Sequence, residues 1–219
     1  MLYDEIDSKL QERESWVLRR QLGIPNNKRL FVLACMDERL PVLEALGINE
    51  GDAHIFRNAG GLVTDDAIRS AMLTTQFFGT QEIIIINHTE CGMMTATGEY
   101  LAEALKKRNI DIGTEVLNPG LPELNLSDQK KNFAKWIQMF ENVDAISEQQ
   151  VKLFKQSKLI PKNIVINSYI WEVETKSLRK PHIRLSEKVN TSQEMSGSKA
   201  CSKCGCLHLE EKKCQCPVK

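Results

Sequence analysis

The sequence contains no long hydrophobic run. Its apolar stretches are far shorter than the roughly 20 residues that a helix needs to cross a bilayer. The first 20 residues carry charges of both signs, where a signal peptide would have an apolar centre. Lys plus Arg and Asp plus Glu number 29 each, so the chain lacks the excess charge that draws a protein to nucleic acid or to an anionic membrane. These absences predict a cytoplasmic protein that binds neither nucleic acid nor a membrane.

Cysteine is scarce through most of the chain and abundant at its end. Of seven cysteines, only Cys35 and Cys91 precede residue 200. The other five lie in the last 19 residues, at Cys201, Cys204, Cys206, Cys214 and Cys216. A disulfide framework would be spread through a small secreted domain, whereas thiols in the cytoplasm stay reduced and available to metals. The distribution indicates one metal site in the body of the protein and a separate thiol-rich tail.

Apolar and amphipathic segments alternate along the 219 residues. Strands are expected at residues 30–34, 53–56, 83–87 and 164–173, and helices at 2–20, 41–46, 66–78, 95–108, 132–140 and 147–156. Thr64 or Asp65 can cap the third helix and Ser147 the last one. A long loop, rich in Pro, Gly, Asn and Asp, is expected at 110–128. This order predicts an α/β fold with a mostly parallel sheet flanked by helices, which binds ligands at the carboxyl ends of its strands.

The chain is expected to have three parts. Residues 1–22 form an N-terminal helix, and residues 23–190 form the main domain. From residue 188 the composition changes to Ser, Lys, Cys and Gln with few bulky apolar groups, so we place a boundary near residue 190. Residues 191–219 then form the thiol-rich tail.

Two short clusters follow predicted strands and carry metal-binding side chains. Cys35 comes directly after the first strand, and His88 and Cys91 come after the third. Two thiols and one imidazole are three ligands of a tetrahedral zinc site, and the open fourth position is typical of a catalytic zinc. Because zinc lowers the pKa of bound water to about 7, its hydroxide could attack an electrophilic carbon. The cluster predicts hydration or hydrolysis, although a single cysteine at a strand end is more often a small core residue.

An acidic and a basic residue follow Cys35 at a spacing of two. Asp37 and Arg39 would point to the same side of extended backbone, where a bidentate pair keeps the carboxylate ionised. Asp37 could then accept the proton of the zinc-bound hydroxide, or it could occupy the fourth zinc position itself. Such a pair is, taken alone, more often structural.

Glycine and apolar residues near the clusters are candidates for binding the substrate. The pair Gly60 and Gly61 lets backbone N–H groups approach the site and donate hydrogen bonds to a substrate atom. Phe77, Phe78 and Met93 are most simply core residues, but they could also form the wall of an apolar pocket.

The motifs Cys-x-Asp-x-Arg at 35–39 and His-x-x-Cys at 88–91, with Arg-Asn-Ala-Gly at 57–60, resemble the β-class carbonic anhydrase family. The resemblance implies that Cys35, His88 and Cys91 bind one zinc ion per subunit and that Asp37 and Arg39 form a catalytic dyad. It also implies the family's parallel α/β fold and an obligate homodimer in which the N-terminal helix, residues 1–22, packs on the partner.

Further stretches resemble the carbon disulfide hydrolases within this family. They lie at residues 24–27, 63–70, 77–80, 160–162, 172–175 and 178–181. The resemblance implies hydrolysis of carbon disulfide, through carbonyl sulfide, to carbon dioxide and hydrogen sulfide, by a homo-oligomer larger than a dimer. An apolar approach to zinc would select this substrate, and candidates for its lining are Phe77, Phe78, Met93 and Met94. The alternatives are a carbonic anhydrase that hydrates carbon dioxide and a catalytically silent zinc- and thiol-binding protein.

The tail lies outside this resemblance. Its five thiols and His208 fall within 16 residues and could bind a structural zinc or another soft metal. They could equally be reactive thiols on a disordered segment, or could cross-link subunits.

Overall fold

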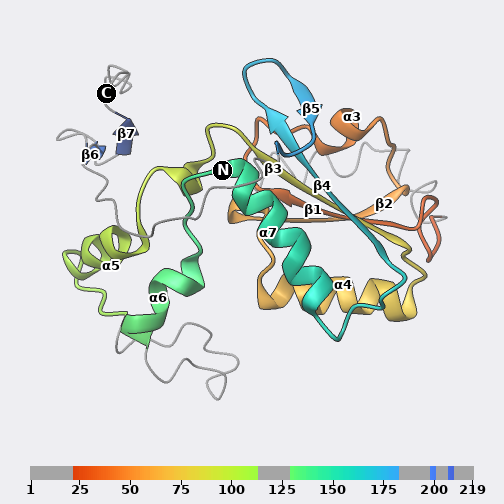
Figure 1. Ribbon diagram of the computed structural model, residues 1–219, viewed down its shortest axis with the longest axis horizontal. Helices are drawn as coiled ribbons and strands as arrows, with labels where there is room; N and C mark the ends of the chain where they lie inside the picture. The colour runs from red at the N-terminus through yellow and green to blue at the C-terminus, as the bar shows by residue number, and fades with distance from the viewer. Residues whose placement is uncertain (1–21, 113–128, 183–197, 201–206, 210–219) are drawn as a thin grey trace, which may run out of the picture.

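A computed structural model describes residues 22–112, 129–182, 198–200 and 207–209 of the chain. Its centre is a five-stranded sheet with the order β2-β1-β3-β4-β5 (Figure 1). The strands are β1 (Leu30–Cys35), β2 (Ala53–Asn58), β3 (Glu82–His88), β4 (Val165–Glu172) and β5 (Ser177–Arg179). The first four strands are parallel, and β5 pairs antiparallel with β4. The predicted α/β fold with a mostly parallel sheet is confirmed.

Helices connect the strands and cover the sheet. They are α3 (Val42–Leu46), α4 (Asp65–Phe77), α5 (Gly98–Lys106), α6 (Gln129–Ile137) and α7 (Val143–Gln156). Short 3₁₀ turns, η1 (Ala59–Gly61) and η2 (Gly92–Met94), follow β2 and β3. The side chain of Thr64 accepts a hydrogen bond from the backbone N–H of Ala67 and caps α4, one of the two caps the sequence offered.

Alternate residues of the central strands build two apolar clusters. Phe31 and Leu33 of β1 join a cluster with Ala71 of α4 and Phe154 of α7. Val32 and Ala34, which point the other way, belong to a second cluster with residues such as Val42 of α3. Figure 1 accordingly shows α4 and α7 together on one side of the sheet and α3 on the other. Because β1 is buried along its whole length, the strand that ends at Cys35 is held firmly in place.

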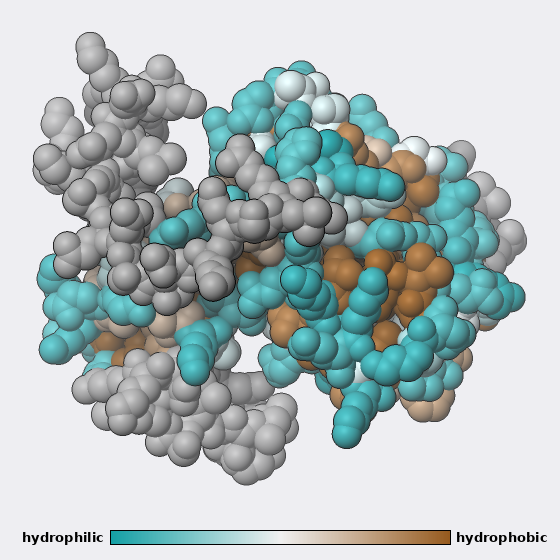
Figure 2. All heavy atoms as spheres, viewed as in Figure 1, coloured by the Kyte–Doolittle hydropathy of each residue, from teal (hydrophilic) through white to brown (hydrophobic). Residues whose placement is uncertain are grey.

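The sheet edge beyond β4 is only partly paired within the described residues. β5 covers Ile170–Glu172, which leaves the N-terminal part of β4 beside α7. A groove there is lined by residues that include Val151 and Ile166. Figure 2 shows hydrophobic residues gathered in this region of an otherwise largely hydrophilic face.

Several predicted helix boundaries are wrong. Helix α5 begins at Gly98 instead of residue 95, and α6 spans Gln129–Ile137 instead of residues 132–140. Helix α7 begins at Val143, and its cap is Asn142, whose side-chain oxygen accepts a hydrogen bond from the backbone N–H of Ala145. Ser147, which the sequence suggested as the cap, is a fully buried residue in the second turn. The three-residue strands β5, β6 (Ser198–Ala200) and β7 (Leu207–Leu209) were not predicted, because so few residues carry no detectable period.

Three sequence predictions lie outside the described residues: the helix at 2–20, most of the loop at 110–128, and the tail cysteines from Cys201 to Cys216. Within the described part of the chain, no helix is long and apolar enough to cross a membrane.

Candidate metal centre

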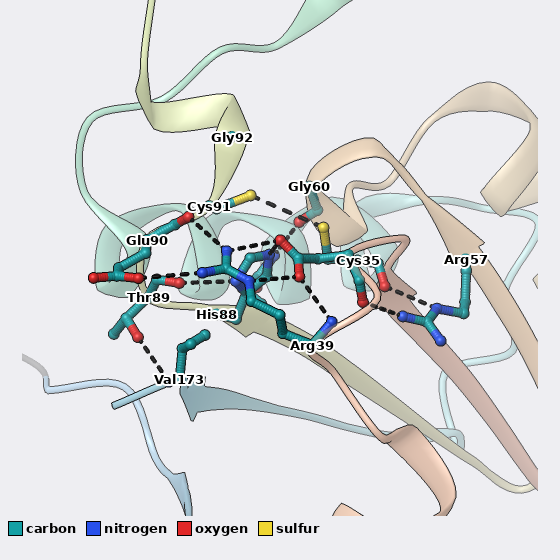
Figure 3. Close-up of polar contacts among 12 residues, drawn as sticks. Cys35, Arg39, Arg57, Gly60, His88, Thr89, Glu90, Cys91, Gly92 and Val173 are labelled. Carbon is teal, nitrogen blue, oxygen red and sulfur yellow. Dashed lines mark hydrogen bonds and ion pairs between the residues drawn. The ribbon is translucent and has the colours of Figure 1, made fainter. Parts of the chain in front are cut away.

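The structure brings Cys35, His88 and Cys91 together at the carboxyl edge of the sheet (Figure 3). Cys35 is the last residue of β1 and His88 the last of β3, and these two strands are neighbours in the sheet. The Sγ atoms of Cys35 and Cys91 lie 3.9 Å apart, and the three ligand atoms lie within 4.8 Å of one another. The residues are 4%, 1% and 2% exposed in sequence order. No other such group of three occurs among the described residues.

The imidazole of His88 is arranged as a metal ligand. Its Nδ1 lies 2.8 Å from the backbone carbonyl of Thr89, so this nitrogen carries the proton and donates it. The lone pair is then on Nε2, which is buried and has no hydrogen-bond partner among the described residues. A buried polar atom without a partner is costly, and a metal ion would remove that cost. Two thiols and this free imidazole nitrogen are a donor set that fits zinc.

The two thiols differ in acidity. The Cys91 thiol donates a hydrogen bond toward Cys35, and this is the largest cause that lowers the pKa of Cys35 to about 4 despite its burial. The thiolate favoured at Cys35 and the burial of Cys91 raise the pKa of Cys91. The pair therefore favours a thiolate at Cys35 over one at Cys91, and a cation bound there would favour both as thiolates.

Asp37 and Arg39 form the predicted bidentate pair. The Arg39 Nε and Nη2 donate to the two carboxylate oxygens of Asp37 at 2.9 and 2.8 Å. These hydrogen bonds lower the pKa of Asp37 to about 2. One carboxylate oxygen of Asp37 lies 3.8 Å from His88 Nε2, so the ionised group faces the place where the three ligand atoms converge.

Glu90 holds the other side of the Arg39 guanidinium. Arg39 Nη1 lies 3.2 Å from the Glu90 carboxylate, and Nη2 lies 3.1 Å from its backbone carbonyl. Glu90 adopts a φ of 54°, a left-handed conformation that is unfavourable for a residue with a side chain. The guanidinium is thus fixed between the two ligand-bearing clusters, and its orientation fixes that of Asp37.

Arg57 supports the backbone that carries the first cluster. Its guanidinium donates to the backbone carbonyls of Cys35 and Asp37 at 2.9 and 2.6 Å. It thereby ties the end of β2 to the loop after β1. The sequence prediction gave no role to Arg57, Glu90 or Thr89, since their roles depend on backbone carbonyls that a motif does not display.

The turn at Gly60 and Gly61 packs directly against the metal centre. The Asn87 side chain donates to the carbonyl of Gly60 at 2.7 Å, and a Cβ added at Gly60 would lie 3.1 Å from Met93 Cγ. Gly60 and Met93 are therefore neighbours, and Met93 packs on the apolar cluster that contains Cys35 and Cys91. Two of the four residues predicted to bind the substrate, Gly60 and Met93, therefore lie beside the proposed ligands.

The other two, Phe77 and Phe78, are not brought to the cluster. They end α4, which runs from the carboxyl end of β2 back to the start of β3, and so they lie at the opposite edge of the sheet. Phe77 is 71% exposed, and the Phe78 ring lies 6.4 Å from the ring of His54.

Replacing Gly61 by alanine should destabilise the fold around the metal centre. Gly61 has a φ of 64°, and an added Cβ would lie only 2.8 Å from the backbone nitrogen of Cys35 and from the carbonyl oxygen of Ile86. The left-handed conformation alone costs a residue other than glycine about 1–3 kcal/mol. The atoms that the Cβ would meet belong to the backbone, so they cannot move aside as a flexible side chain could. Thermal unfolding should show a clearly lower Tm for Gly61→Ala, whereas Gly23→Ala, where nothing lies within 4 Å, should match the parent. An unchanged Tm for Gly61→Ala would contradict this close packing.

Comparisons with known proteins agree with this geometry. Residues 30–174 match the carbonic anhydrase family model. A carbon disulfide hydrolase from Acidithiobacillus thiooxidans is 56% identical over 196 residues, which are 89% of this chain and 98% of the relative. The solved apo form of a carbon disulfide hydrolase has a TM-score of 0.71 and 45% identity over 90% of this chain and 98% of its own. A carbonic anhydrase structure from Streptococcus mutans has a TM-score of 0.64 and 33% identity over 81% of this chain and 97% of its own.

Proposed function

This chain belongs to the β-carbonic anhydrase family, and from that membership and the geometry of its metal centre we propose that it hydrolyses carbon disulfide. The reaction takes two steps, in which carbon disulfide and water give carbonyl sulfide and hydrogen sulfide, and carbonyl sulfide and water then give carbon dioxide and a second hydrogen sulfide. The observation that carries the choice of substrate is the 56% identity to a carbon disulfide hydrolase over nearly the whole of that relative.

We propose that Cys35, His88 and Cys91 hold one zinc ion per chain. Zinc in such a site supplies a water-derived nucleophile at neutral pH and polarises the substrate. The free Nε2 of His88 and the two adjacent sulfurs support this assignment. Cys35 and His88 end strands of the sheet, and Cys91 lies in the turn directly after β3, so the three groups are already close together.

Asp37 is proposed to orient the attacking water. Its carboxylate is ionised, because Arg39 holds its pKa at about 2. It therefore accepts a hydrogen bond from the water at any working pH and leaves the lone pair of the water directed at the substrate carbon. Arg39 keeps the carboxylate in this orientation, and Glu90 keeps Arg39 in place. Because the water is already oriented, the reaction does not have to lose this orientational entropy at the transition state.

Gly60 and Met93 are the proposed substrate-lining residues that one subunit supplies to its own site, because they pack beside the ligand cluster. Phe77 and Phe78 would have to act on the site of a neighbouring subunit. The predicted homodimer and larger homo-oligomer, the cytoplasmic location and a second soft-metal site in the tail stay predictions.

Carbonic anhydrase activity is the second candidate, and the likeness to the Streptococcus mutans enzyme favours it. Carbon disulfide and carbon dioxide are both linear triatomic electrophiles, so the ligands and Asp37 could act on either. The choice depends on the approach to the metal.

A paired assay tests the substrate. Purified full-length protein is mixed with carbon disulfide while released sulfide is measured, and with carbon dioxide while proton release is followed. We expect sulfide release well above that of free zinc at the same concentration. Carbon dioxide hydration without sulfide would make the protein a carbonic anhydrase, and inactivity toward both would favour a zinc- and thiol-binding protein.

A further inference from the structure

The turn from His88 to Cys91 contains both the second and third metal ligands and the support for Arg39. Between the ligands lies Thr89, a residue that no motif marks as functional. Every hydrogen-bonding group of Thr89 is used: its N–H, its carbonyl, and both the donor and the acceptor of its hydroxyl. Three of these bonds run to the chain at the end of β4, and the fourth runs to His88.

The hydroxyl of Thr89 replaces a backbone acceptor in the sheet. In a pair of parallel strands, one residue normally bonds to two residues of the partner strand that are two apart in sequence. Its N–H donates to the carbonyl of the first, and its carbonyl accepts from the N–H of the second. Thr89 donates to the carbonyl of Trp171 at 3.0 Å, so Val173 would normally donate to the Thr89 carbonyl. Instead, the Val173 N–H donates to Thr89 Oγ1 at 3.0 Å.

This replacement frees the Thr89 carbonyl for the metal ligand. The carbonyl accepts the hydrogen bond from His88 Nδ1 at 2.8 Å, which leaves Nε2 as the nitrogen that faces the two sulfurs. The hydroxyl is itself held by the Glu174 carboxylate, to which it donates at 2.7 Å. The turn between β4 and β5 thus supports the imidazole through a single side chain.

We propose that Thr89 is a positioning residue for the metal centre, because its hydroxyl takes the place of its carbonyl in the β3–β4 ladder and so fixes the tautomer and orientation of His88. The inference rests on the proposed zinc function. It also extends to Arg39, because Glu90 follows Thr89 directly and holds the guanidinium through its carbonyl and its carboxylate. Figure 3 shows Thr89 and Val173 beside the cluster that they support.

The test compares zinc affinity in variants that differ by one hydroxyl. Metal-free full-length protein is titrated with zinc in competition with a chromophoric chelator. Thr89→Val keeps the shape of the side chain but removes the hydroxyl, so that the Val173 N–H can bond to the carbonyl of residue 89 instead. We expect zinc to bind to this variant about 10–100-fold more weakly. Thr89→Ser keeps the hydroxyl and should restore affinity close to that of the parent. Thr75→Val is the matched control, because it removes a hydroxyl that bonds to Ala71 on α4, far from the metal.

The outcomes separate this inference from the proposed zinc site. Cys35→Ser defines the background from any other zinc-binding group, and a parent that binds no more zinc than this variant would refute the zinc site itself. A parent that binds zinc and a Thr89→Val variant that binds it equally well would overturn the role of Thr89 alone. A Thr89→Ser variant as weak as Thr89→Val would overturn it too, because the methyl group would then matter. If Thr89→Val does not fold, Glu174→Ala removes only the outer support, and an unchanged affinity in that variant would contradict the proposal.

Discussion

The Cys35→Ser variant is expected to lose one zinc ion per chain and, with it, the release of sulfide from carbon disulfide. Serine has nearly the size of cysteine, so the buried end of β1 should keep its packing. Its hydroxyl stays protonated at neutral pH and is a poor zinc ligand, whereas the pKa of the Cys35 thiol is already lowered to about 4 by the neighbouring Cys91 thiol. Loss of an outer partner of a zinc ligand costs about 10–100-fold in affinity, so loss of a ligand should cost more than about 100-fold.

Metal analysis and sulfide release should be measured on the same preparations. Because the tail carries five further cysteines, the informative quantity is the difference in zinc per chain between the parent and Cys35→Ser. Cys204→Ser makes the same chemical change at a cysteine that the proposed zinc site does not use, and it should keep full turnover. If Cys35→Ser kept its turnover and Cys204→Ser lost it, the catalytic centre would have been assigned to the wrong cysteines.

Replacing Asp37 by asparagine should also have a large effect on activity. We expect it to lower turnover while zinc stays bound. Asparagine keeps the shape of the side chain but removes the negative charge that accepts the hydrogen bond from the attacking water. It also breaks the bidentate pair with Arg39, because the amide offers one acceptor oxygen in place of the two that Arg39 now reaches at 2.9 and 2.8 Å. Loss of a group that directs a proton in this way costs on the order of 100-fold or more in kcat.

A second Asp–Arg pair in the chain provides the control. Asp66 and Arg69 form an exposed ion pair in the first turn of α4, and neither belongs to the ligand cluster. Asp66→Asn therefore makes the same chemical change and should leave kcat unaltered. The steady-state kcat for carbon disulfide, measured with zinc content for each variant, gives the comparison. Equal kcat values for Asp37→Asn and the parent would remove Asp37 from the mechanism.

Much of the candidate metal centre could be predicted because its proposed ligands follow the most regular elements. Cys35 and His88 end strands whose apolar runs are unmistakable, and parallel strands deliver such residues to one edge. Thr89 and Glu90 were not predicted as supports because they act through backbone carbonyls whose direction depends on the register of β3 and β4. The start of helix α7 was predicted wrongly for a different reason. Asn142 and Ser147 are both residues that favour an N-cap, and only the packing of the helix decides which of them is the cap.

The apolar candidates were predicted less well for a physical reason. Adjacent hydrophobic residues such as Phe77 and Phe78 predict that their side chains pack against another part of the protein. They do not predict at which edge of the sheet this packing occurs. Met93 could be placed near the ligands because it follows Cys91 within a few residues. Nearness in sequence to a ligand was therefore the more reliable guide.

The complete burial of β1 separates assembly of the protein from acquisition of its metal. The six residues of this strand pair with β2 on one side and with β3 on the other, and they do so through backbone bonds that need no ion. Small zinc domains, in contrast, are unfolded until the ion arrives. We therefore expect the metal-free chain to fold. Supply of zinc in the cell would then set how many folded molecules are active, not how many molecules fold.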